Sequence, residues 1–157
     1  MHSNELNLYL LTLVSKEKLK HSLDTSGKNC KIHRNVYIGK GVNIGNLCKI
    51  QNNNSIYPGV TIKEGIFIGT NVYFTNNMYP RAILRSGQAV SSEDWDRKET
   101  LIKYGTSIGS GAVIRSGVTI GEWAMIGCGA VVLENVPDGA TVVGNPVHII
   151  TSKEIIK

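Results

Sequence analysis

Isoleucine recurs every six residues along most of this chain, and this period constrains the fold more than any other feature. The series is unbroken from residue 32 to residue 74, stops, and resumes from residue 102 to residue 132. Its members are Ile32, Ile38, Ile44, Ile50, Ile56, Ile62, Ile68 and Phe74, and then Ile102, Ile108, Ile114, Ile120, Ile126 and Val132. A period of six matches neither the helical repeat of about 3.6 residues nor the alternation of a single strand.

A short strand followed by a corner, repeated, does match a period of six. Three such sides close a triangular coil, and residues one coil apart then stack on each other. One interior column is expected from Ile32, Ile50 and Ile68, and another from Ile38, Ile56 and Phe74. Stacked coils hydrogen-bond at about 4.8 Å, as neighbouring strands do. The sequence therefore predicts an all-β protein, a parallel β-helix with an aliphatic interior.

Glycine and cysteine accompany the isoleucines at fixed positions. In six repeats a glycine follows the series member, and we expect it to turn the corner with a positive φ. These glycines are Gly39, Gly45, Gly69, Gly109, Gly121 and Gly127. Cys30 and Cys48 are one coil apart, where a disulfide between stacked parallel strands is geometrically awkward. Buried reduced thiols are expected there.

The segments outside the repeat complete the predicted organisation. A chain of 157 residues suffices for one domain, divided into an N-terminal cap (1–29), the β-helix (30–146) and a C-terminal cap (147–157). Solenoid ends expose unpaired backbone and need such caps. A short helix is expected in the first cap, with a partner-binding helix as the alternative. The helix is expected because four apolar residues there have helical spacing, namely Leu6, Leu10, Leu13 and Val14.

Charge and composition exclude several classes of protein. The net charge of +5 is concentrated in residues 1–63, with nine Lys and Arg against three Asp and Glu. No dense basic run accompanies it, so a solvated surface is expected rather than a nucleic-acid site. The chain contains no apolar run of membrane-spanning length and no secretory signal pattern. Three cysteines without metal-ligand spacing indicate a reduced, cytoplasmic protein without a metal site.

Residues 75–101 interrupt the repeat without ending it. Long loops inside compact repeats are usually functional. This one contains amide, aromatic and basic side chains suited to polar recognition, namely Asn76, Asn77, Tyr79, Arg81, Arg85 and Trp95.

The hexads resemble the left-handed parallel β-helix of the hexapeptide-repeat acyltransferases. Within that superfamily, residues 74–81 (FTNNMYPR) resemble the FTNDxxPR segment of bacterial nucleotide-linked amino-sugar N-acetyltransferases, and matches continue in order over residues 30–150. The resemblance implies transfer of acetyl from acetyl-CoA to the amine of a dTDP- or UDP-linked amino-deoxy sugar, for surface glycan biosynthesis. The 3-amino-3,6-dideoxyhexose and 3-amino-glucuronate types are both compatible. It also implies a homotrimer with its sites between subunits.

The resemblance assigns roles residue by residue. Asn76 would hold the acceptor sugar, Arg81 would meet sugar or phosphate oxygens, and Asn77 and Tyr79 would complete the acceptor site. The pantetheine of CoA would lie along stacked coils, with the Ser110 amide as donor to the oxyanion. The other positions implied for CoA are Cys128, Ala130, Asn145 and Pro146. Relatives carry a lysine for the CoA phosphate where this chain has Leu133-Glu134, so that contact falls to Lys153 or Lys157, or CoA affinity is lower.

No histidine falls within the insertion, although related O-acetyltransferases place one near this loop. A hydroxyl acceptor usually needs a general base, whereas an oriented amine attacks as the free base. Direct attack by the sugar amine is therefore expected. His33 is the one candidate for a base, and it is better explained as a solvated or packed residue. A sugar O-acetyltransferase and a non-catalytic scaffold are the alternatives.

Overall fold

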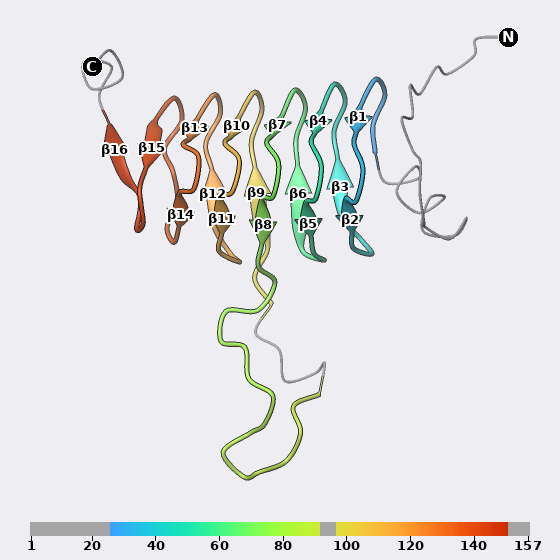
Figure 1. Cartoon of the computed structure of the whole chain (residues 1–157), viewed down its shortest axis with the longest axis vertical. Helices are drawn as coiled ribbons and strands as arrows, with labels where there is room; N and C mark the ends of the chain where they lie inside the picture. The colour runs from blue at the N-terminus through green and yellow to red at the C-terminus, as the bar shows by residue number, and fades with distance from the viewer. Residues whose placement is uncertain (1–25, 92–96, 151–157) are drawn as a thin grey trace, which may run out of the picture.

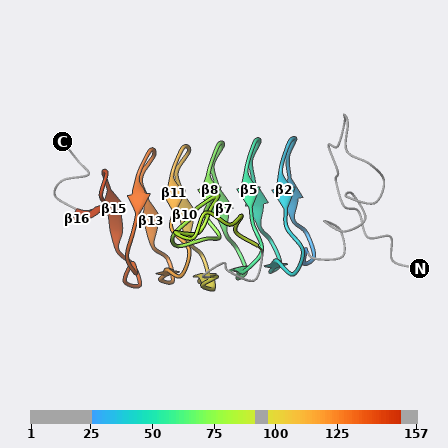
Figure 2. The same ribbon diagram turned by 90° about the horizontal axis from the view of Figure 1, so that it is seen from below.

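The computed structural model describes residues 26–91 and 97–150, and all regular structure in that part of the chain is β-strand. The strands are two or three residues long and lie on three sheets, which form the faces of a prism (Figures 1 and 2). Sheet 1 contains β1 (Lys31–Ile32), β4 (Lys49–Ile50), β7 (Phe67–Ile68), β10 (Ser107–Ile108), β13 (Met125–Ile126), β15 (Thr141–Val143) and β16 (His148–Ile150). Sheet 2 contains β2 (Tyr37–Ile38), β5 (Ser55–Ile56), β8 (Tyr73–Phe74), β11 (Val113–Ile114) and β14 (Val131–Val132). Sheet 3 contains β3 (Asn43–Ile44), β6 (Val60–Ile62), β9 (Thr100–Ile102) and β12 (Thr119–Ile120).

Each of the first four coils, from β1 to β12, contributes one strand to each sheet. Ile50 pairs in parallel register with Ile32 on one side and Ile68 on the other. Ile56 pairs in the same way with Ile38 and Phe74. The predicted interior columns and the parallel β-helix are therefore confirmed. We call the bends from sheet 1 to sheet 2, from sheet 2 to sheet 3, and from sheet 3 to sheet 1 corners 1, 2 and 3.

The insertion leaves the prism at corner 2, between β8 and β9, and projects away from it as an arm (Figure 1). Its predicted end at residue 101 was wrong. Thr100 and Leu101 already belong to β9, where they pair with Val60 and Thr61 of β6. The arm therefore spans residues 75–99, because the sheet recovers its register before the next isoleucine.

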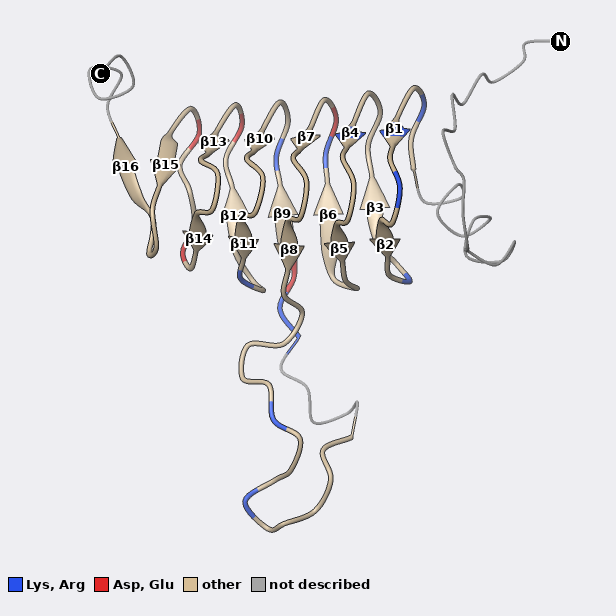
Figure 3. Cartoon of the chain, viewed as in Figure 1, with Lys and Arg blue, Asp and Glu red and all other residues tan. Residues whose placement is uncertain are grey.

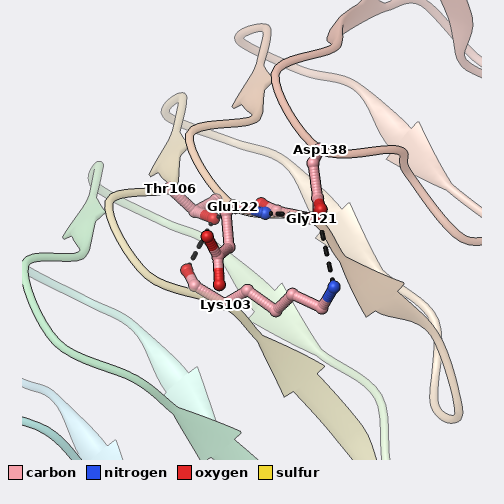
Figure 4. A network of polar contacts seen from close by, with 5 residues as sticks. All are labelled: Lys103, Thr106, Gly121, Glu122 and Asp138. Carbon is pink, nitrogen blue, oxygen red and sulfur yellow. Dashed lines mark hydrogen bonds and ion pairs between the residues drawn. The ribbon is translucent and has the colours of Figure 1, made fainter.

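The interior is filled by the isoleucine columns and by the β-branched, small or polar residues that lie two places before them. Ile50, Ile68, Ile108 and Ile114 are fully buried. Thr106 is a buried polar corner residue, and its hydroxyl lies 2.8 Å from the carbonyl oxygens of both Lys103 and Gly121 (Figure 4). Buried polar groups are tolerated when they are hydrogen-bonded in this way.

The glycines that follow the isoleucines do not turn the corners, contrary to the sequence prediction. None of the six has a positive φ; that conformation occurs two residues later in the corner. Its occupants include Gly41, Gly59, Gly65, Gly105, Gly111, Gly117 and Gly129, and also Asn35, Asn53 and Asn71. The predicted glycines serve close stacking instead. At Gly109 a Cβ would lie 2.6 Å from the backbone nitrogen of Cys128 on the next coil.

Cys30 and Cys48 are buried free thiols, as predicted. The Cys30 Sγ lies 3.1 Å from the Gly45 carbonyl oxygen, and the Cys48 Sγ lies 3.2 Å from that of Lys63. A hydrogen bond from Cys48 lowers the pKa of Cys30 to about 7. The same contact, together with burial, raises the pKa of Cys48.

Both ends of the β-helix differ from the expected boundaries. Ser26 already bridges to Ile44, and the Gly27 N–H donates to the Ile44 carbonyl, so the solenoid begins before residue 30. At the other end β16 pairs antiparallel with β15 rather than adding a parallel strand. The predicted helix at residues 6–14, and Trp95, Lys153 and Lys157, lie outside the described residues.

Candidate active site

The root of the arm is fixed to the prism by Ser116, which follows β11 at corner 2 and is fully buried. Its backbone N–H donates to Thr75 Oγ1 at 2.9 Å, and its hydroxyl donates to the Lys98 carbonyl at 2.9 Å. The Gly117 N–H donates to Thr100 Oγ1 at 3.0 Å. One turn of the next coil therefore holds both ends of the arm. Sequence reasoning missed Ser116, although a polar residue two places after an isoleucine and one coil beyond the insertion was a usable signal.

The predicted acceptor residues lie at the root and along the first part of the arm. Asn76 and Asn77 are half-buried, whereas Tyr79 and Arg81 are exposed. Asn77 Oδ1 accepts a hydrogen bond from the Tyr79 N–H at 3.0 Å, which fixes the turn that leads into the arm. Within the described residues the side chain of Asn76 makes no hydrogen bond. Asn76 is thus a half-buried amide with its donors and acceptor open.

The tip of the arm is a small hairpin with exposed apolar side chains. Ile83 bridges antiparallel to Ala89, and the Leu84 N–H donates to the Gln88 carbonyl at 2.8 Å. Tyr79 is 75% exposed and Ile83 is 59% exposed. In the single chain this apolar surface faces solvent.

The predicted CoA positions Ser110 and Cys128 lie on corner 1, stacked on successive coils. The Gly129 N–H donates to the Ser110 carbonyl at 2.8 Å, which holds the two turns together. At the equivalent position of an earlier coil, the Thr70 N–H donates to Ser110 Oγ. In the described structure the N–H groups of Ser110 and Cys128 have no such acceptor. Two open backbone donors therefore follow each other along the axis.

The Asn145–Pro146 turn extends this line toward the C-terminal end. Val142 pairs with Ile126, so the residues after β15 follow Cys128 at the next level of corner 1. Asn145 and Pro146 are exposed and joined by a cis peptide bond. Ala130, also predicted for CoA, differs from these residues in its environment. Its side chain is buried, its N–H donates to the Gly127 carbonyl, and its carbonyl accepts from the Val113 N–H.

One chain does not bring the acceptor and donor residues together. Thr70 stacks directly on Ser110, and Asn76 lies six residues beyond Thr70, at the next corner. Six residues are one side of the triangle, up to about 20 Å of extended backbone. His33 is also remote, because it lies on corner 1 of the first coil, three coil spacings or about 14 Å from the level of Gly109.

Corner 3 carries a polar network on the same coils. Asp138 Oδ1 accepts from the Glu122 N–H at 2.8 Å and from Lys103 Nζ at 3.2 Å (Figure 4). The hydrogen bond from Glu122, followed by that from Lys103, lowers the pKa of the Asp138 carboxyl. This network ties the last coils together and offers no nucleophile.

Residues 26–91 and 97–150 contain neither a metal-ligand cluster nor a membrane-spanning helix. No group of three or more His, Cys, Asp or Glu side chains in these ranges is placed to hold a metal ion. No helix there is long and apolar enough to cross a membrane.

Profiles of hexapeptide repeats match the chain on both sides of the arm. The bacterial transferase hexapeptide (six repeats) matches residues 100–134, and the hexapeptide repeat of succinyl-transferase matches residues 27–58. Both stretches thus match hexapeptide-repeat models, and the fold is that of a left-handed parallel β-helix.

The chain is similar to several acyltransferases. It is 32% identical to a serine acetyltransferase of Buchnera aphidicola subsp. Acyrthosiphon pisum (strain APS) over 93% of this chain and 43% of the relative. It is 50% identical to a dTDP-3-amino-3,6-dideoxy-alpha-D-galactopyranose 3-N-acetyltransferase of Aneurinibacillus thermoaerophilus over 32% of this chain and 26% of the relative. This chain thus spans less than half the length of either relative.

Solved structures show the same fold. AntD, an N-acyltransferase from Bacillus cereus in complex with dTDP and 3-hydroxybutyryl-CoA, superimposes with a TM-score of 0.62 at 23% identity. The match covers 91% of this chain and 92% of AntD.

Proposed function

We propose that the protein is an acetyl-CoA-dependent N-acetyltransferase that acylates the amino group of a nucleotide-linked amino-deoxy sugar. The proposal rests on two sets of polar groups that have no hydrogen-bond partners in the described part of the chain, one at the root of the arm and one along corner 1. Asn76 presents an unpaired amide at the root of the arm, and Ser110 and Cys128 present unpaired N–H groups along the axis. The 50% identity with a dTDP-amino-sugar N-acetyltransferase supports an amino sugar as the acceptor.

The reaction needs orientation and charge stabilisation more than a proton acceptor. The sugar amine attacks the thioester carbonyl as the free base, a C–N bond forms, and the C–S bond breaks as CoA thiolate leaves. The proton released from nitrogen passes to that thiolate or to solvent. The Ser110 N–H donates to the oxygen on which negative charge develops, a contribution that such donors make in acyl transfer. Asn76 orients the sugar, and Arg81 binds anionic oxygens of the acceptor.

The proposed site forms between copies of the chain. Asn76 and Ser110 lie on different corners of one prism, so the arm of one copy meets corner 1 of the next. The exposed Tyr79 and Ile83 of the arm then gain a surface to pack on. A homotrimer closes this head-to-tail contact into a ring.

Release of free CoA thiol with defined acceptors tests the proposal. Nucleotide-linked amino sugars are expected to support release, whereas the corresponding sugars with a hydroxyl in place of the amine are not. Asn76→Ala is expected to lose roughly ten- to a hundredfold in kcat/KM because it removes hydrogen bonds to the oriented acceptor. His33→Ala, the matched control, is expected to stay within about twofold, since the amine needs no base. Full activity of the first variant with loss in the second would overturn this mechanism.

Acyl transfer to a hydroxyl is the second candidate, because the serine acetyltransferase relative matches over 93% of this chain. L-Serine and sugar hydroxyls therefore belong in the same panel of acceptors. Release of CoA with these alone would favour that candidate.

A further inference from the structure

Arg115 has a polar atom that the described structure leaves unsatisfied. It follows Ile114 of β11 at corner 2, beside the root of the arm. Its Nε is buried without a hydrogen-bond partner, and its side chain as a whole is only partly covered. A buried guanidinium donor without an acceptor is costly and rare, and it calls for an explanation.

The neighbours of Arg115 in the stack supply no charged partner. Ile114 pairs with Phe74 on one side and with Val132 on the other. The residues that stack on Arg115 are therefore Thr75 and Leu133, neither of which is charged. Between described residues the ion pair is Lys103–Asp138, at corner 3. Among residues 26–91 and 97–150, no carboxylate forms such an ion pair with Arg115.

The position of Arg115 relative to the acceptor residues is fixed. Thr75 donates its N–H to the Ile114 carbonyl at 2.9 Å and accepts from the Ser116 N–H at 2.9 Å, so it is held on both sides of Arg115. Asn76, with its open side chain, is the next residue. In Figure 3 the bend after β11 is a basic segment next to the point where the arm leaves. The open amide of Asn76 and the unpaired Nε of Arg115 thus lie on adjacent coils at one corner.

We infer that Arg115 binds an anionic oxygen group of the acceptor, a sugar carboxylate or the nucleotide diphosphate, and so contributes to acceptor specificity. This inference rests on the proposed function. Guanidinium groups bind carboxylate and phosphate through paired N–H donors. The bound oxygens satisfy the guanidinium donors, while Asn76 orients the sugar at the same corner.

Kinetics with a matched pair of acceptors tests this role. One acceptor is a nucleotide-linked 3-amino-3-deoxyglucuronate, and the other is the 3-amino-3-deoxyglucose that has a hydroxymethyl group in place of the carboxylate, each prepared with UDP and with dTDP. Arg115→Gln is expected to raise the acceptor KM roughly ten- to a hundredfold, with the KM for acetyl-CoA and the melting temperature unchanged. Arg115→Lys keeps the charge but not the paired donors, and is expected to fall between. Arg34→Gln, at corner 1 of the first coil, is the control that leaves all values unchanged.

The outcomes distinguish a sugar carboxylate from the nucleotide diphosphate as the group that Arg115 binds. They also test the role of Arg115 separately from the proposed function. A loss confined to the glucuronate identifies the carboxylate, and an equal loss for both acceptors identifies the diphosphate. An acceptor KM within twofold of wild type for Arg115→Gln overturns the role of Arg115 alone, as does a lower melting temperature with unchanged KM. No acetyl transfer by the wild type to any of these acceptors overturns the proposed function, and the role of Arg115 with it.

Discussion

Alanine substitutions at Gly109 and Gly111 separate the two uses of glycine within one corner. At Gly109 a Cβ would lie 2.6 Å from Cys128 N and 2.8 Å from the Ile126 carbonyl oxygen, where ordinary contact begins at 3.4 Å. Both are backbone atoms, and the Gly109 N–H to Ile126 carbonyl hydrogen bond is only 2.8 Å long. The coils must separate by several tenths of an ångström, so Gly109→Ala is expected to cost about 3 kcal/mol.

Gly111 has room but an unfavourable backbone conformation for other residues. Its φ is +74°, and a Cβ there would meet nothing closer than 3.8 Å. Gly111→Ala is therefore expected to cost about 1 kcal/mol. Gly111→Asn is expected to cost less, because Asn35, Asn53 and Asn71 occupy the same corner position with φ near +56° to +60°.

Urea unfolding at one fixed protein concentration measures these differences, since an oligomer's stability depends on concentration. The expected order of destabilisation is Gly109→Ala, then Gly111→Ala, then Gly111→Asn. The reasoning is refuted if Gly111→Ala unfolds at the same urea concentration as Gly109→Ala or at a lower one.

Two further predictions concern the corner networks. The lowered pKa of Asp138 means that folding favours its ionised form. The contribution of Asp138 to folding stability is therefore fully present above the ordinary carboxyl pKa of 3.8, and it is lost as the pH falls through the lower pKa of the folded state. Asp138→Asn should therefore flatten the loss of stability in acid, measured by pH-dependent unfolding, whereas the exposed Glu134→Gln should not; identical acid profiles for all three proteins would contradict this. Ser116→Ala removes the donor to the Lys98 carbonyl and should cost about 1 kcal/mol, with faster hydrogen exchange at Gly117 and Thr100 but not at Gly109. Unchanged exchange at Gly117 would show that Ser116 does not hold the arm.

The repeat made most of the fold predictable from sequence. Stacking of Ile32, Ile50 and Ile68 follows from spacing alone, because only one coil length aligns a period of six on three sides. The conformation of each corner does not follow from spacing. Gly109 and Gly111 differ in role because one faces the backbone of the next coil and the other faces open space, and both appear in the sequence simply as glycine.

The candidate site was predictable in part. Asn76 and Ser110 were named from motif and register, and the structure leaves groups of both open. Ser116 and Arg115 were missed because their roles depend on contacts with Thr75 and Lys98, which lie at the two ends of the insertion and outside the repeat pattern. Ala130 was named from the family resemblance, which carries no information on how its backbone groups are paired within the fold.

Identification of the acetylated product tests the central claim most directly. The protein is incubated with acetyl-CoA and a nucleotide-linked amino sugar, and the product is analysed by mass spectrometry before and after treatment with hydroxylamine, which cleaves esters and leaves amides. The account predicts one added acetyl group that survives this treatment because it is on nitrogen. An acetyl group removed by hydroxylamine, or release of CoA without any acetylated sugar, would contradict it.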